Sequence, residues 1–147
     1  MQLLEYGDYE CPFCGDAHAI VEEIKQRLGD ELLFVFRNLP LINIHPHAEH
    51  AAEAAEAAGA QGDFWRMHDR SRVRLKIKTS LGMQPSSASM HPINSGSPPY
   101  APRIREDFKS GVRAGVNGTP TFFINGERYD GAFDLRHFLN ALTSQSA

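Results

Sequence analysis

The chain has 147 residues, of which 41% are hydrophobic and 22% are charged, and its formal net charge at pH 7 is −3. This length suffices for a single domain over residues 1–147 with a substantial core, and the mild acidity argues against nucleic acid as a partner. No apolar run approaches the roughly 18 residues of a membrane-spanning helix, and no basic and apolar leader opens the chain. We therefore expect no membrane insertion, no export signal in this chain and, as the sequence stands, a cytoplasmic location.

The first forty residues alternate between predicted strand and helix. Residues 2–6 have the pattern of a strand, and an apolar helical face follows and ends at Gly29. Residues 31–37 are a short apolar and aromatic run, typical of a buried strand. A strand, a helix and a strand within about 35 residues form a βαβ unit, which favours parallel pairing. The predicted helical face consists of Cys14, Ala17, Val21, Ile24 and Leu28.

Further helices and a hairpin are predicted downstream. The alanine-rich residues 46–59 predict a helix, and residues 63–69 predict another with Asp63 as its cap. Residues 103–116 predict a helix, and residues 118–131 read as two strands joined by an Asn-Gly turn. A final helix is expected after Asp134. Its predicted buried face is Leu135, Phe138, Leu139 and Leu142.

The segment 71–100 differs from its flanks. Val73, Leu75 and Ile77 alternate with basic residues, which predicts a strand. After Ser80 the sequence is rich in Ser, Pro and Gly and has no periodicity. A stretch of this kind inside a compact domain is uncommon unless it is functional or disordered.

The two cysteines, Cys11 and Cys14, lie where the first strand meets the first helix. A disulfide that closes so small a loop constrains the unfolded chain very little, so the pair is a poor structural staple. Unpaired N–H groups and the helix dipole stabilise a thiolate at a helix start, which predicts a lowered pKa for Cys11. Pro12 suits the first helical turn. Cys14, one turn later and more buried, would resolve a mixed disulfide formed at Cys11.

Three acidic residues precede the pair closely in sequence. Asp8 and Glu10 are expected to face solvent, where screening weakens their effect on a thiol pKa. Glu5 has two open placements. It either lies buried below the cysteines, where it would exchange protons with Cys14, or it faces water at an edge.

The Thr119-Pro120 bond is a candidate cis peptide because it follows a flexible Asn-Gly pair and precedes a predicted buried strand. Pro120 has no N–H group and cannot donate a hydrogen bond to the sulfurs. The backbone of Thr119 would then remain free to pair with an extended peptide.

Three stretches carry a family resemblance: EYGDYECPFCG, VFRNLPL with the following HPHAEHAAEAAEAAGAQGDFWRMHD, and GVRAGVNGTPTFFINGERYDGAFD. Together they resemble the DsbA-like branch of the thioredoxin superfamily over roughly residues 2–70 and 100–142. The resemblance implies an α/β thioredoxin-like fold, with a mixed central sheet flanked by helices and an inserted segment at about 63–114. Family members often work in the periplasm or otherwise outside the cytoplasm.

The resemblance also implies a thiol–disulfide oxidoreductase that acts on protein thiols or disulfides without a cofactor or metal. In this reading Cys11 is the nucleophile, Cys14 resolves, and Glu5 is the buried acid. A cis Pro120 belongs to the catalytic group. The residues expected to contact substrate are Pro12, Phe13, Gly118 and Thr119. Recycling would fall to a membrane quinone-linked oxidase for an exported protein, or to a thioredoxin or glutathione system for a cytoplasmic one.

Two departures from the family leave alternatives open. Pro-Phe replaces the Pro-His of strong oxidants, and such pairs also resemble glutaredoxins, so a glutathione-dependent reductase is one alternative. A non-enzymatic interaction or regulatory module, once fused to a membrane protein, is another. The segment 71–100 has the length of the family's helical lid without its composition. A displaced reading frame, which would leave the segment disordered, is our hypothesis for it, and the coding DNA tests it.

For the remaining histidines, aromatic residues and basic residues we expect structural rather than functional roles. His45, His47 and His50 could complete a zinc site with the cysteines, but we expect a solvated helix start and no metal. His18 lies one turn past Cys14 and could tune that thiol, but we expect it on an exposed helix face. Phe64 and Trp65 are expected in the core. The basic residues 70–78 are expected to be a solvated edge rather than a nucleic-acid site.

Overall fold

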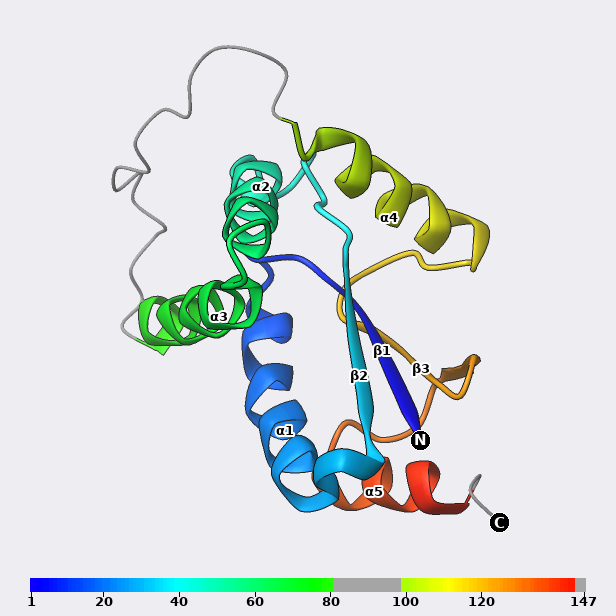
Figure 1. The fold of residues 1–147 in the computed structure, drawn as a ribbon. Coiled ribbons are helices and arrows are strands. Elements are labelled where there is room, and N and C mark those ends of the chain that lie inside the picture. Colours follow the sequence, from blue (N-terminus) through cyan, green and yellow to red (C-terminus); the bar gives the residue numbers. More distant parts are fainter. Residues whose placement is uncertain (81–98, 145–147) are drawn as a thin grey trace.

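A four-stranded mixed sheet forms the centre of the structure, a computed structural model that describes residues 1–80 and 99–144, with only the backbone for 74–80. The strands are β1 (Gln2–Gly7), β2 (Leu33–Asn38), β3 (Thr121–Ile124) and β4 (Glu127–Tyr129), in the order β2-β1-β3-β4 (Figure 1). β1 is parallel to β2 and antiparallel to β3, and β3 is antiparallel to β4. The predicted mixed sheet and its parallel βαβ start are confirmed.

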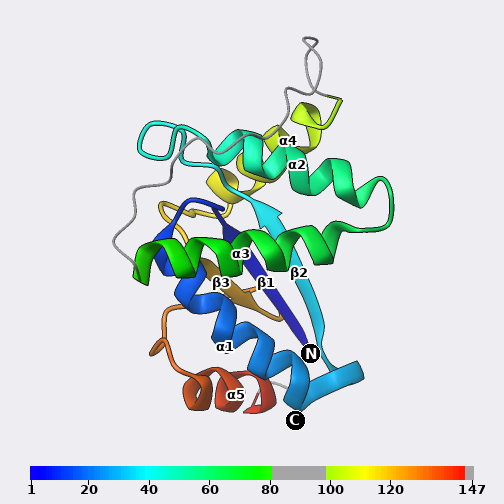
Figure 2. The same cartoon turned by 90° about the vertical axis from the view of Figure 1, so that its left-hand side faces the viewer.

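Helices cover both faces of this sheet. α1 (Pro12–Leu28) and α5 (Leu135–Ser144) lie on one face, and α4 (Ala101–Arg113) lies on the other (Figure 1). α2 (Ala48–Gly59) and α3 (Phe64–Ser80) follow β2, and α3 packs against both α1 and α2 (Figure 2). The 3-10 turn η1 (Gly29–Glu31) ends α1 at Gly29, whose φ of 49° suits a residue without a side chain.

The main core lies between the sheet and the pair α1 and α5. Alternation along β1 points Leu3 and Glu5 toward α1, whereas Tyr6 points toward α4 and packs with Leu39. Phe138 packs on Phe122, with ring centroids 5.1 Å apart. The buried members of the main core are Leu3, Ala17, Val21, Ile24, Phe122, Ile124, Phe138 and Leu142.

The predicted hairpin and final helix are confirmed. Asn125 and Gly126 have φ values of 48° and 90° and join β3 to β4. The Asp134 carboxylate accepts a hydrogen bond from the backbone N–H of His137 at 3.0 Å, which caps α5.

The prediction of a strand over the alternation at 72–78 is wrong, because these residues continue α3. Seven alternating residues are a short signal, and a helix that has already formed from Phe64 onward extends at little further cost. α3 and α4 both lie in the inserted segment predicted at 63–114. The hypothesis of a displaced frame and disorder falls mostly on residues 81–98, which lie outside the described residues. Within the described part of the chain, no helix is long and apolar enough to cross a membrane.

Candidate active site

The two cysteines lie beyond the carboxyl ends of β1 and β2, at the start of α1. Cys11 is the N-cap residue of α1, and its backbone N–H donates to the Asp8 carbonyl at 3.2 Å. Its Sγ lies 3.3 Å from the Thr119 carbonyl oxygen. Both cysteines are free thiols, and Cys14 is the more deeply buried of the two.

The Cys11 pKa is lowered to about 5. The main cause is a hydrogen bond from the Cys14 thiol, with smaller contributions from Thr119 and from the backbone N–H groups of Cys14 and Phe13. Burial opposes these hydrogen bonds but does not cancel them. Because the donors at the start of α1 favour the charged form, Cys11 is a thiolate at neutral pH.

Cys14 has the opposite environment. Burial raises the pKa of its thiol well above the ordinary value, and the donation of its proton to Cys11 adds to this effect. The backbone N–H of Asp8 lies 3.5 Å from its Sγ. The two sulfurs therefore differ in charge at neutral pH, since Cys11 at the N-cap of α1 ionises and the more deeply buried Cys14 keeps its proton.

Glu5 has the buried placement of the two that the sequence left open, and its partner is Arg72 from α3. The Arg72 Nη2 lies 3.2 Å from the Glu5 Oε1, and the two side chains are 0% and 3% exposed. Arg72 also donates to the Asp8 carbonyl at 2.8 Å. Burial raises the pKa of the Glu5 carboxyl although the Arg72 guanidinium lowers it.

Arg72 is the residue of the site that the sequence did not single out. Its guanidinium stacks near the rings of Tyr9 and Phe36, 4.9 Å and 5.0 Å from their centroids. The expectation that the basic run 70–78 is solvated is therefore wrong for Arg72, because α3 turns this position toward β1 and α1. A period of 3.6 residues applied from Phe64 through His68 would have marked Arg72 as inward facing.

Gly7 provides room for this buried pair. A Cβ atom at this position would lie 2.4 Å from the Arg72 Nη2, 2.5 Å from the Phe36 ring and 2.8 Å from the Glu5 Oε1. The absence of a side chain at the end of β1 therefore permits the guanidinium to reach Glu5.

Asp8 is buried, and the expectation that it faces solvent is wrong. Its carboxylate accepts hydrogen bonds from the backbone N–H of Glu10 at 2.7 Å and of Leu41 at 2.9 Å, and contacts the His45 Nδ1 at 2.8 Å. These contacts tie the loop after β2 to the loop that precedes Cys11. The expected solvated helix start accordingly holds for His50 and His47, which are exposed, and not for His45.

The segment Gly118–Pro120 lies opposite Cys11, and the Thr119-Pro120 peptide bond is cis. The Thr121 hydroxyl donates to the Gly118 carbonyl at 2.7 Å and thereby closes this turn. Pro12 and Phe13 are exposed, and Phe13 presents 70% of its surface to solvent. Of the residues that the sequence predicted to contact substrate, Thr119 lies against the Cys11 sulfur through its carbonyl, and Pro12 and Phe13 are exposed at the start of α1.

The surroundings of His18 and Trp65 differ from those that the sequence predicted. His18 is half-buried rather than exposed, with its ring centroid 5.8 Å from that of His68. Phe64 packs at the edge of the core, whereas Trp65 is 43% exposed and lies against Phe34. Burial, followed by the charge of Arg72, lowers the His68 pKa to about 2, so this ring is neutral.

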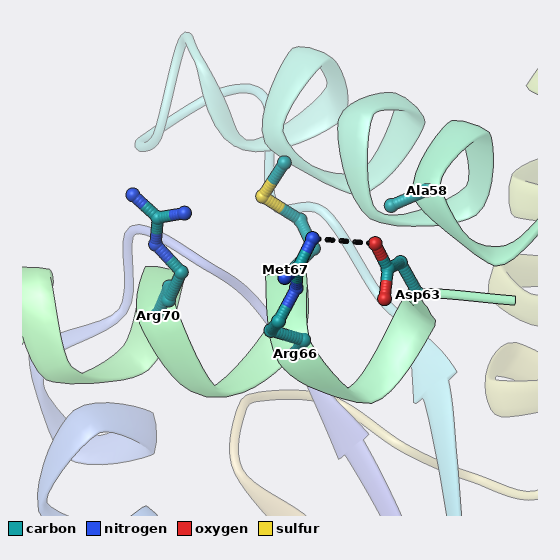
Figure 3. A pocket seen from close by; sticks show the side chains of 5 residues that line it. All are labelled: Ala58, Asp63, Arg66, Met67 and Arg70. Atoms are coloured by element: carbon teal, nitrogen blue, oxygen red, sulfur yellow. Dashed lines mark hydrogen bonds and ion pairs between the residues drawn. The ribbon is translucent and has the colours of Figure 1, made fainter. Parts of the chain in front are cut away.

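A shallow pocket between α2 and α3 lies apart from the cysteines. Its carboxylate Asp63 pairs with Arg66 at 2.6 Å (Figure 3). The lining contains neither Cys11 nor Cys14, and no residue predicted to contact substrate. Its lining is Ala58, Asp63, Arg66, Met67 and Arg70 (Figure 3).

Solved structures share this fold. A thioredoxin-like oxidoreductase from Silicibacter pomeroyi DSS-3 aligns with a TM-score of 0.73 at 21% identity, over 99% of this chain and 87% of its own. BdbD from Bacillus subtilis aligns with a TM-score of 0.73 at 18% identity, over 98% and 86%. DsbA2 from Pseudomonas aeruginosa aligns with a TM-score of 0.74 at 20% identity, over 99% and 88%. The structure therefore has a thioredoxin-like fold, as predicted.

The family model described as thioredoxin (Thioredoxin_4) matches residues 1–144, so the chain belongs to the thioredoxin family. Similar sequences occur in longer proteins. The Na(+)/H(+) antiporter NhaA 1 of Salinispora arenicola (strain CNS-205) is 39% identical over 99% of this chain and 23% of its own length. That of Mycobacterium sp. (strain KMS) is 35% identical over 95% and 24%. The chain thus spans about a quarter of the length of these relatives.

Proposed function

We propose that this chain is a thiol–disulfide oxidoreductase that exchanges disulfides with proteins through the pair Cys11 and Cys14. The observation that carries the proposal is the placement of the two sulfurs, with Cys11 at the N-cap of α1 and Cys14 fully buried one turn later. Cys11 has a pKa of about 5 and lies beside an exposed rim, whereas Cys14 is buried and protonated. Thiol–disulfide exchange requires a thiolate that attacks or leaves readily and a neighbour that resolves the mixed disulfide.

In the reducing direction, the Cys11 thiolate attacks one sulfur of a substrate disulfide. The substrate S–S bond breaks, a mixed disulfide forms at Cys11, and the other substrate sulfur leaves as a thiolate. Cys14 then loses its proton and attacks the Cys11 sulfur, which releases the second substrate sulfur. Two electrons pass from the pair to the substrate, and the reverse sequence oxidises a substrate dithiol.

Glu5 and Arg72 support proton transfer at the buried sulfur. Cys14 must lose a proton to attack and must regain one after it leaves, and a residue that is 0% exposed has no direct contact with bulk solvent. Glu5 is the carboxylate coupled to Cys14, and we assign it the role of proton acceptor. The Arg72 guanidinium holds the Glu5 carboxylate in place, with 3.2 Å between Nη2 and Oε1. Its positive charge also favours the thiolate form of Cys14 during the exchange.

The segment Gly118–Pro120 and the exposed pair Pro12 and Phe13 are assigned to substrate contact. A Cβ atom at Gly118 would meet no other atom within 4 Å, so an approaching chain finds open space there. An extended peptide that pairs with the backbone of Thr119 brings its sulfur near Cys11, whose Sγ lies 3.3 Å from the Thr119 carbonyl.

The test combines reduction of insulin disulfides with oxidation of a reduced, unfolded substrate. We expect Cys11→Ser to abolish both activities and Cys14→Ser to accumulate mixed disulfides with the substrate. A reduction potential of about −120 mV indicates an oxidase, and one of about −200 to −230 mV indicates a glutaredoxin-like reductase. Turnover that persists without Cys14 contradicts the assigned roles.

A second candidate function is a non-enzymatic module of a transport protein. The observation that favours it is the 39% identity to an antiporter of which this chain covers only 23%. This candidate requires that the purified chain shows no exchange with either substrate while its Cys11 and Cys14 still form a disulfide.

A further inference from the structure

Three side chains of metal-ligating types meet between α1 and α3. His18 lies on α1, one turn after Cys14, and His68 and Asp69 are consecutive on α3. One ligand atom from each residue lies within 4.8 Å of the others. We propose that His18, His68 and Asp69 form a binding site for a divalent transition-metal ion of the Zn²⁺ type.

The donor set suits such an ion. Two imidazole nitrogens and one carboxylate oxygen are all ligands that Zn²⁺ accepts, and three protein ligands leave one position of a tetrahedron for water. Bonds of about 2.1 Å in a tetrahedral site place donors roughly 3.4 Å apart. The present separation of up to 4.8 Å thus requires a closure of up to about 1.4 Å, within reach of side-chain rotations. His18 and Asp69 are half-buried, so an ion can enter from solvent.

The surroundings of His68 are those of an oriented ligand. Its Nδ1 lies 2.9 Å from the Tyr9 hydroxyl, which leaves Nε2 for an ion. Metal-bound histidines commonly use their second nitrogen for such an outer hydrogen bond, which holds the ring in place. The rings of Phe36 and Phe64, with centroids 4.5 Å and 5.9 Å away, restrict the imidazole further.

Asp69 supplies an independent observation. Its Oδ1 is buried and has no hydrogen-bond partner among the residues that the structure describes. A buried carboxylate oxygen without a partner is costly, and a bound cation satisfies it. The positive charges nearby are paired, because Lys25 contacts Glu22 at 2.5 Å and Arg72 contacts Glu5 at 3.2 Å.

Trp65 makes the site measurable. It is the only tryptophan of the chain, and its ring centroid lies 5.5 Å from that of His68. We suggest titrating the double variant Cys11→Ser/Cys14→Ser, which lacks competing thiols, with Co²⁺ as a coloured substitute for Zn²⁺. Saturable quenching of Trp65 fluorescence by one ion per chain, reversed by Zn²⁺, is the expected result.

Matched variants assign the ligands. We expect His18→Gln and Asp69→Asn to weaken Co²⁺ binding by about tenfold or more, while His47→Gln, at an exposed histidine, leaves binding unchanged. His68 is buried and is left intact, and circular dichroism checks that each variant folds. The proposal is overturned if the folded double variant shows no saturable quenching, or if the His18 and Asp69 variants bind Co²⁺ as tightly as His47→Gln.

Discussion

The hydrogen bond from Cys14 to Cys11 is the largest cause of the low Cys11 pKa, so its removal tests the electrostatics of the site directly. Cys14→Ala deletes the donor, whereas Cys14→Ser keeps a hydroxyl donor of similar size at the same buried position. The pair of variants therefore separates hydrogen bonding from the loss of the second sulfur, which both variants share.

The expected magnitude follows from the energy of a hydrogen bond to a charged acceptor, about 1.5–3 kcal/mol. At 1.36 kcal/mol per pKa unit, its loss raises the pKa by roughly 1–2 units. Cys14→Ala should thus move the Cys11 pKa from about 5 to roughly 6–7. At pH 6 the thiolate fraction then falls from about 90% to between about 10% and 50%. Backbone donors keep the pKa below that of a free thiol.

Ultraviolet thiolate absorbance measured against pH reports this titration, because either variant contains Cys11 as its only cysteine. Cys14→Ser should retain a pKa near that of the parent pair. Two results refute the reasoning: a pKa in Cys14→Ala that stays near 5, or equal rises in both variants. An unchanged pKa in Cys14→Ala would show that the Cys14 thiol does not lower the Cys11 pKa by donating a hydrogen bond. Equal rises in both variants would show that altered burial, and not the lost donor, changes the Cys11 pKa.

The remaining predictions concern the buried pair and the redox state. Arg72→Met should cost about 3–5 kcal/mol at neutral pH because Glu5 loses its partner, and Glu5→Gln added to Arg72→Met should recover most of this loss in urea unfolding. Without Arg72 the pKa of the buried Glu5 carboxyl rises further above 4.5, so the folded state binds more protons than the unfolded chain between 4.5 and that raised pKa. The free energy of unfolding of Arg72→Met should therefore fall as pH rises through this range. A loss of stability that does not depend on pH contradicts this account. Gly7→Ala should destabilise by about 1–3 kcal/mol through overlap with Arg72, while Gly118→Ala, in open space, should leave the unfolding midpoint unchanged. The Cys11 pKa is lower in the folded protein than in the unfolded chain, so the unfolded chain binds more protons at pH values between these two pKa values. The free energy of unfolding of the reduced protein should therefore rise relative to that of the oxidised protein by at most about 2.7 kcal/mol from pH 5 to pH 7, and by less where solvent screens the sulfur. A difference in unfolding free energy that does not change with pH would count against the low pKa.

Local sequence patterns predicted the parts of this protein that depend on near neighbours. The alternation of residues 2–6, the helical face from Cys14 to Leu28 and the Asn125-Gly126 turn each specify their structure within a few residues. The prediction of a strand at 72–78 was wrong for the same reason, since seven alternating residues also fit the end of a helix whose start lies further back.

Long-range contacts decided the environment of the buried charges. Asp8 meets the backbone N–H of Leu41 and the ring of His45, more than thirty residues away, so its burial has no local signal. Arg72 lies 67 residues from Glu5, and a basic run that alternates with apolar residues predicts a solvated edge. The cluster of His18, His68 and Asp69 likewise forms only where α3 packs on α1.

The order of the elements and the position of two sulfurs at the start of a helix were set by the sequence itself, because periodicity, turns and helix starts act over a few residues. The packing of α3 against α1 and β1 decided the rest: it buries Arg72 against Glu5 and gathers the metal-ligating side chains. Whether a given side chain of α3 faces the core or the solvent depends on how the whole helix packs against the other elements. A local sequence pattern does not contain that information.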